Sequence, residues 1–137
     1  MRVIAALFVA LGLSGPAQAM DFTKADDIEP ILGMTKMNWV AVREWDGKDL
    51  LYFTHLITYR CGIEQVRYYI NVGKPRIREM EECYWDLPQP FIIQDPNGYV
   101  IYDEFEMQSI QTITVEITLE NGTVLRETFE RKQVWIP

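Results

Sequence analysis

A strict alternation of apolar and polar residues from Thr112 to Leu119 constrains the fold more than any other feature of the sequence. The apolar residues of this run are Ile113, Val115, Ile117 and Leu119. Side chains of a β-strand point alternately to its two faces, so the run predicts a strand with one buried face.

The next apolar run continues this pattern into a hairpin. Leu125 and Phe129 are also odd-numbered, so a loop of odd length must join the two strands. A type I turn through Glu120-Asn121-Gly122, with Gly122 left-handed in a G1 bulge, predicts that Ile117 pairs with Leu125 and Ile113 with Phe129.

Two further alternating runs, Leu51–Tyr59 and Val66–Val72, predict a central hairpin joined through residues 60–63. The register that keeps the apolar side chains on one face makes these pairs: Phe53 with Ile70, His55 with Tyr68, and Ile57 with Val66.

His55 is the only histidine, and its position allows two interpretations. A functional histidine would act as a general base or a pH sensor. The alternation instead places His55 in the apolar core against Tyr68, and no nucleophile signature stands beside it. We therefore expect a structural His55 and Tyr68, with burial lowering the pKa of the imidazole.

The rest of residues 38–137 predicts more short strands separated by turns. Strands are expected within residues 39–45 and 76–83, and a further hairpin is expected between residues 91–93 and 99–102. This pattern favours an all-β, single-domain antiparallel β-sandwich of immunoglobulin-like architecture, with a small β-barrel as the alternative. In residues 20–37, a capping box at Thr23–Asp26 leads into at most a short helix, because Pro30 and Gly33 follow.

Residues 1–19 have the pattern of a secretory signal peptide: Arg2, an apolar run from Val3 to Leu13, and small residues at Ala17 and Ala19. We expect cleavage after Ala19 and a soluble periplasmic or secreted protein. The apolar run is shorter than the roughly 20 residues that span a bilayer.

The two cysteines, Cys61 and Cys83, predict one structural disulfide. Export to an oxidising compartment favours this pairing, and the spacing does not match a Cys-x-x-Cys redox motif.

Acidic residues outnumber basic ones, with a formal net charge of −7 that becomes −8 when residues 1–19 are removed. Nucleic-acid binders cluster Lys and Arg to neutralise phosphates, whereas the basic residues here are interleaved with carboxylates. We expect no nucleic-acid partner and no membrane insertion after signal cleavage.

No catalytic, metal or cofactor motif is recognisable. The clusters Glu79-x-Glu81-Glu82 and Asp103-Glu104-x-Glu106 do not match a calcium loop and are interpreted as solvated strand edges. With both cysteines paired, the soft ligands of a zinc site are also lacking. We predict a protein that is not an enzyme and carries no cofactor.

The aromatic residues exceed what one small core can hide, so some must be exposed. Exposed Trp and Tyr beside Arg are typical of protein interfaces and sugar platforms. The candidate binding surface comprises Trp39, Arg43, Arg67 and Tyr69.

Thr58-Tyr59-Arg60-Cys61 resembles the opening of the periplasmic inhibitors of C-type lysozyme. The resemblance covers this stretch alone, and the Ser-Gly-x-x-Tyr segment of those inhibitors has no counterpart in residues 20–137. It implies inhibition of an exported hydrolase. Three function classes follow: a non-enzymatic binding module for an exported protein or cell-envelope partner, an inhibitor of this kind, and a small hydrolase.

Overall fold

The computed structural model describes residues 12, 15, 21–95 and 97–137. The predicted signal peptide lies outside the described residues except for Gly12 and Gly15, and the cleavage position at Ala19 also lies outside them. Within the described part, no helix is both long enough and apolar enough to cross a membrane.

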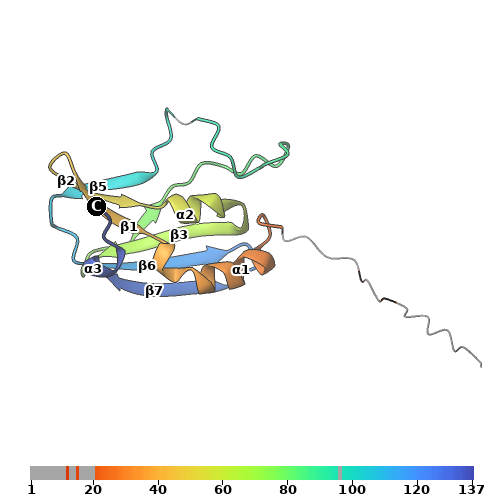
Figure 1. Cartoon of the computed structure of the whole chain (residues 1–137), viewed down its shortest axis with the longest axis horizontal. Helices are drawn as coiled ribbons and strands as arrows, with labels where there is room; N and C mark the ends of the chain where they lie inside the picture. Colours follow the sequence, from red (N-terminus) through yellow and green to blue (C-terminus); the bar gives the residue numbers. More distant parts are fainter. Residues whose placement is uncertain (1–11, 13–14, 16–20, 96) are drawn as a thin grey trace, which may run out of the picture.

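The chain is built mainly of strands in two antiparallel sheets (Figure 1). The three-stranded sheet has the order β1-β2-β5, formed by Ala41–Trp45, Lys48–Tyr52 and Tyr102–Glu106. The four-stranded sheet has the order β4-β3-β6-β7, formed by Arg76–Arg78, Ile63–Ile70, Thr112–Leu119 and Val124–Glu130. Neither sheet closes on itself in the described residues, so the barrel alternative is wrong.

Five short helical segments complete the described structure: α1 (Ala25–Met34), η1 (Lys36–Asn38), α2 (Thr54–Thr58), η2 (Arg60–Gly62) and α3 (Arg131–Val134). The predicted capping box is wrong, because α1 is capped by Lys24 without a side-chain hydrogen bond. Thr23 instead bonds to the Asp21 carboxylate. Pro30 lies inside α1, where it is exposed.

The β6–β7 hairpin has the predicted register. Ile117 pairs with Leu125 and Ile113 with Phe129. Gly122 has a φ of 86°, in the left-handed region that glycine adopts without strain. The odd-numbered residues of β6 are fully buried, and the even-numbered ones are half exposed.

The central hairpin predicted from Leu51–Tyr59 and Val66–Val72 is wrong. β2 ends at Tyr52 and pairs with β1 and β5, whereas β3 pairs with β4 and β6. Between β2 and β3 the chain forms α2 and η2. Phe53, Leu56 and Ile57 are all buried, and a strand would have turned Leu56 to the opposite face from its two neighbours. One helical turn buries all three.

The later strand predictions are confirmed only in part. β4 forms within the predicted residues 76–83, at one edge of its sheet, but it ends at Arg78. The predicted hairpin between residues 91–93 and 99–102 does not form, and β5 begins only at Tyr102. At the C-terminus, β7 is followed by α3, and Trp135 makes an isolated bridge to Val42.

One hydrophobic core joins both sheets and the helices. The inner face of the four-stranded sheet contributes Val66, Tyr68 and the odd-numbered residues of β6. The three-stranded sheet contributes Val42 and Leu51, and α1 contributes Ile28 and Leu32. The core therefore forms only after segments from the whole described chain come together.

A buried ion pair fixes the start of α3 against the three-stranded sheet. Asp49 is fully buried and accepts hydrogen bonds from Arg131 at 2.6 Å and from the backbone N–H groups of Gln108 and Ile110. Desolvation opposes ionisation of Asp49, but these hydrogen bonds outweigh it and hold its pKa below the ordinary value of 3.8. Arg131 also reaches Glu44 at 2.9 Å.

Asp49→Asn should lower the free energy of unfolding by about 3 kcal/mol near neutral pH, because it leaves Arg131 partly unpaired and buried. The contribution of a carboxylate with a lowered pKa is present above its unfolded value and is lost as the pH falls through its folded value. Urea unfolding should therefore show the difference between the two proteins shrinking in acid below about pH 3.8. The exposed turn residue Asp46, changed to Asn, is the control and should change stability little. Equal losses in both variants would contradict the prediction.

Candidate functional site

A long irregular segment connects β4 to β5, and we call residues 79–101 the β4–β5 loop. It is the extended excursion drawn in green and teal in Figure 1, away from the strands of both sheets. Loops longer than about 15 residues without regular structure are uncommon in compact domains and are usually functional or disordered. The contacts at its base show whether its backbone is held in place.

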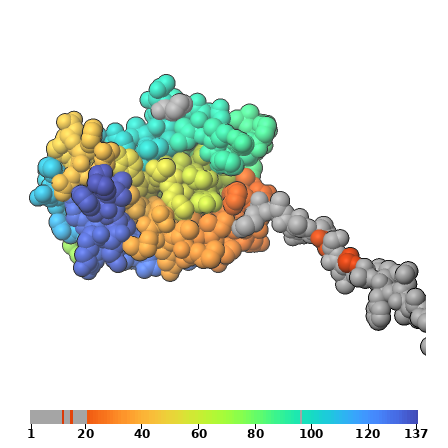
Figure 2. Space-filling view, viewed as in Figure 1, coloured from red at the N-terminus to blue at the C-terminus, as the bar shows by residue number. Residues whose placement is uncertain are grey.

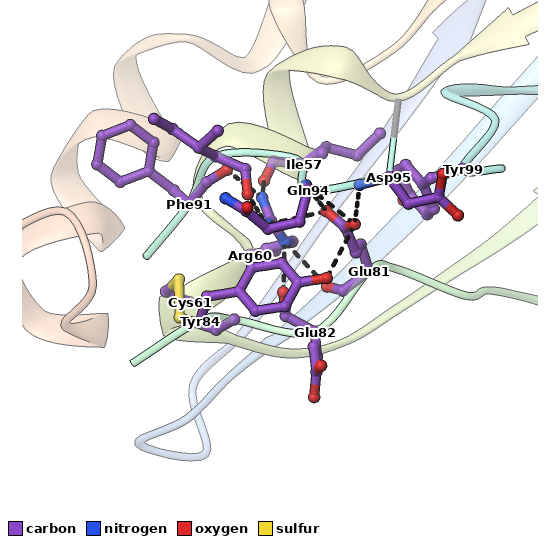
Figure 3. A network of polar contacts seen from close by, with 12 residues as sticks. Ile57, Arg60, Cys61, Glu81, Glu82, Tyr84, Phe91, Gln94, Asp95 and Tyr99 are labelled. Carbon is purple, nitrogen blue, oxygen red and sulfur yellow. Dashed lines mark hydrogen bonds and ion pairs between the residues drawn. A yellow bond between two sulfur atoms is a disulfide. The ribbon is translucent and has the colours of Figure 1, made fainter. Parts of the chain in front are cut away.

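The Arg60 guanidinium organises the backbone of the β4–β5 loop (Figure 3). Arg60 is 4% exposed, and its Nε donates to the carbonyls of Glu81 at 2.9 Å and Glu82 at 3.2 Å. Its two terminal nitrogens donate to the carbonyls of Phe91 and Ile92. One side chain thus binds both arms of the loop.

Glu81 supplies the counter-charge and a second set of bonds. Its side chain is 8% exposed, and one carboxylate oxygen lies 3.4 Å from Arg60 Nη2. The carboxylate also accepts the backbone N–H groups of Gln94 and Asp95 and the Tyr84 hydroxyl. Desolvation, together with this hydrogen bond to Glu81, raises the pKa of Tyr84. The pair therefore holds the middle of the loop as well as its base.

The disulfide between Cys61 and Cys83 is present as predicted, with a Cα–Cα distance of 5.1 Å. It lies beside the Arg60 contacts in Figure 3. The β3–β4 ladder pairs Val66 with Arg78, and the same register continued along the chain would place Cys83 opposite Cys61. The disulfide thus holds the start of the loop beside the N-terminal end of β3, beyond the last hydrogen-bonded pair of the β3–β4 ladder.

Large apolar side chains remain exposed on this anchored loop. Trp85 is 62% exposed, while Leu87 and Ile92 are 40% and 42% exposed. Leu87 and Ile92 line the same small cavity of about 200 Å³, so they lie close together. In Figure 2 the loop covers the upper part of the visible face, above α2. A backbone anchored at several points therefore carries apolar side chains that the fold does not bury.

Trp85 also borders two adjoining hollows near the disulfide. One, of about 400 Å³, lies between β3, β4 and the start of the loop, and its exposed carboxylates are Glu64, Glu79, Glu82 and Glu120. The other, of about 600 Å³, lies beside the start of α1. Both are lined by Cys61, Trp85 and Glu120.

The predicted candidate surface does not form a single patch. Trp39 is fully buried, where its Nε1 donates to the Leu32 carbonyl, so its placement on a surface is wrong. Arg43 lies in β1 and stacks over Trp45, with 4.4 Å from its guanidinium carbon to the ring centroid. It therefore belongs to the other sheet from Arg67 and Tyr69.

Arg67 and Tyr69 do lie together on the outer face of the four-stranded sheet. Arg67 Nε is 2.7 Å from Glu116 Oε1, and the Tyr69 hydroxyl donates to the same oxygen. Partial desolvation of Glu116 opposes its ionisation, but hydrogen bonds from Arg67 and Arg126 lower its pKa. The charged side chains of this patch are therefore already paired with one another across neighbouring strands.

The placement of His55 on a strand against Tyr68 is wrong. His55 lies in α2, where its ring is half-buried beside Tyr59, with 5.2 Å between ring centroids. Its Nε2 is 2.8 Å from Thr35 Oγ1. Burial lowers the pKa of His55, as expected from the sequence.

Tyr68 is a core residue, but its partners differ from those predicted. It is 2% exposed and packs against Phe53 at 5.0 Å between ring centroids, and its hydroxyl donates to Asp103. Desolvation is the main cause of its raised pKa, and the hydrogen bond to Asp103 adds to it. Arg78 binds the other oxygen of Asp103.

No three His, Cys, Asp or Glu side chains gather in a metal-binding arrangement among the described residues. No family model, no curated protein and no solved structure matches this chain. The geometry and chemistry of the site are therefore the basis for any functional proposal.

The sequence did not identify Arg60 or Glu81 as anchors. Glu81 belongs to an acidic cluster that the sequence predicts to be a solvated strand edge, yet its side chain is buried. The adjacency of Arg60 to Cys61 was the only available signal, because the carbonyls that Arg60 binds have no signature in the sequence.

Arg60→Met should lower the free energy of unfolding by about 3–5 kcal/mol, because it leaves the Glu81 charge and several carbonyls buried without their partner. Hydrogen exchange measured by mass spectrometry should be faster in the variant than in the unsubstituted protein, and this increase should be larger in residues 79–101 than in β6 and β7. The exposed Arg126, changed to Met, is the control. Unchanged exchange in the loop would contradict the anchoring role.

An NMR titration should give His55 a pKa below its ordinary value of 6.5, since burial disfavours the imidazolium ion. A lowered folded pKa means that the unfolded chain binds more protons, so stability should fall as the pH drops below about 6.5. His55→Gln should remove this component and cost about 1 kcal/mol near neutral pH through the weakened Thr35 contact. A pKa of 6.5 or above would refute the buried assignment.

Proposed function

We propose that this protein is an exported, non-enzymatic binding module that holds a protein partner through the β4–β5 loop. The observation that carries the proposal is a loop whose backbone is fixed by Arg60 and by the disulfide while Trp85, Leu87 and Ile92 stay exposed.

Fixing the loop before binding favours association. A flexible segment loses conformational entropy when a partner orders it, whereas a preorganised one has lost that entropy on folding. Tryptophan is one of the residue types that supply most of the binding free energy at protein interfaces, and exposed Leu and Ile side chains add apolar area for a partner to bury. The β4–β5 loop combines a preorganised backbone with exposed apolar side chains.

Export is supported by the predicted signal peptide and by the disulfide, since disulfides persist in oxidising compartments. For the architecture, we propose an immunoglobulin-like sandwich. The single core that unites residues of both sheets supports this arrangement.

An inhibitor of an exported hydrolase is the second candidate. Preorganised loops are typical of complexes in which the inhibitor backbone moves little on binding. The resemblance at Thr58–Cys61 adds weight, because Arg60 and Cys61 are the two residues that hold the loop.

A small hydrolase is less favoured by the surroundings of His55. The Thr35 hydroxyl beside it already donates to the Ile31 carbonyl at 2.7 Å. The imidazole is then the donor to Thr35 and does not act as a base that activates it.

Residues 20–137, immobilised and exposed to a periplasmic extract, should retain a partner whose capture depends on the loop. The double variant Leu87→Ser with Ile92→Ser should weaken the measured affinity at least tenfold, because it removes two exposed apolar side chains and leaves the anchors intact. Val72→Ser is the matched control, since Val72 is fully exposed and lies outside the loop.

Equal capture by the loop variant and the control would contradict the proposal. A lysozyme inhibition assay separates the two leading candidates. Inhibition that is lost in the loop variant would favour the inhibitor, while capture without inhibition would favour the binding module.

A further inference from the structure

A further cavity lies far from the β4–β5 loop, at the opposite end of the four-stranded sheet. It has a volume of about 580 Å³, within the ~300–1,000 Å³ range of small-molecule sites. β6 contributes residues near its start, whereas Glu120, beside the loop, follows its end. The eight residues of β6 separate the two regions by roughly 25 Å at about 3.3 Å per residue.

The residues around this cavity come from the start of β6, the end of β7 and the segment through α3. They are Gln111, Thr112, Glu130, Arg131, Lys132 and Trp135. Figure 1 shows α3 and the C-terminus together at this end of the molecule. Five of these six side chains are polar, and Trp135 supplies the one large apolar surface.

The walls of the cavity are fixed by bonds that do not involve a ligand. Arg131 is held by Asp49 and Glu44, and its backbone N–H donates to the Gln111 carbonyl at 2.8 Å. Trp135 bridges to Val42, and the N–H of the following residue donates to the Val42 carbonyl. Trp135 remains 49% exposed although its backbone is held.

The charges around the cavity are already compensated. Lys132 Nζ lies 3.1 Å from Glu130 Oε2, and Arg131 is neutralised by two carboxylates. An anion would compete with these carboxylates, and a cation would compete with Lys132 and Arg131. An uncharged ligand does not compete with any of these charged side chains.

Hydrogen-bonding capacity remains on the neutral groups. Gln111 uses one amide N–H for the Gln108 carbonyl. Among the described residues, neither the Gln111 amide oxygen nor the Thr112 hydroxyl has a protein partner. These groups accept, and the hydroxyl and the second amide N–H donate, so a ligand with several hydroxyl groups fits them.

We propose that this cavity binds a neutral pyranose sugar, which stacks on Trp135 and exchanges hydrogen bonds with Gln111 and Thr112. A pyranose has a face of C–H groups that packs on an aromatic ring, and hydroxyl groups around its edge that both donate and accept. An apolar ligand would leave the polar rim unsatisfied, and an ion would meet charges that are already paired.

The test is an NMR titration of residues 20–137 with methyl glucopyranoside and methyl galactopyranoside, following the indole N–H signals. At least one of the two should shift the Trp135 signal saturably, in the millimolar range expected of a single sugar unit. Trp135→Ala should abolish binding. Trp45→Ala is the matched control, since Trp45 is 58% exposed but does not line the cavity.

Thr112→Val keeps the shape of the side chain and removes the hydroxyl, so it should weaken the sugar affinity by up to about tenfold without unfolding the protein. Glucuronate, which adds a negative charge to the same ring, should bind no more tightly than the neutral sugar. Three results would overturn the proposal: no saturable shift with either neutral sugar, unchanged binding in Trp135→Ala, or tighter binding of glucuronate or inorganic phosphate.

Discussion

The burial of one guanidinium group, that of Arg60, is the constraint on which the irregular part of this structure depends. A buried cation is unfavourable unless it is paired and its N–H groups are bonded. Here Glu81 supplies the charge, and carbonyls from both arms of the β4–β5 loop accept the N–H groups. The loop and Arg60 are therefore mutually dependent, since neither satisfies its polar groups without the other.

The sequence predicts the regular parts of the fold best where local pattern and tertiary packing agree. In β6 and β7, the alternation and Gly122 both require one register, and that register is found. Between Leu51 and Tyr59, alternation also fits a strand, but Leu56 has to be buried together with Ile57. The same sequence pattern thus allows either a strand or a helix. Contacts between segments distant in the chain, here the pairing of β2 with β5, determine which one forms.

The disulfide was predictable because the chain has two cysteines, Cys61 and Cys83, and a predicted signal peptide favours their oxidation. The proposed binding surface was not predictable, because exposure depends on how elements pack. Trp39 and Trp85 are the same residue type, yet the first is fully buried and the second is 62% exposed. Glu81 was likewise not predictable as a buried residue, since the charges of an acidic run do not indicate which carboxylate forms an ion pair with an arginine.

The atoms that Arg60 binds in the loop are mainly backbone carbonyls, which every residue type possesses. The conformation of residues 79–101 is therefore largely independent of which side chains point outward at positions such as Leu87 and Ile92. Under the proposed function, substitutions at these positions would alter what the loop recognises without altering how it is held. During evolution, or in a laboratory library, a loop held in this way can change its outward side chains while the same scaffold continues to fold.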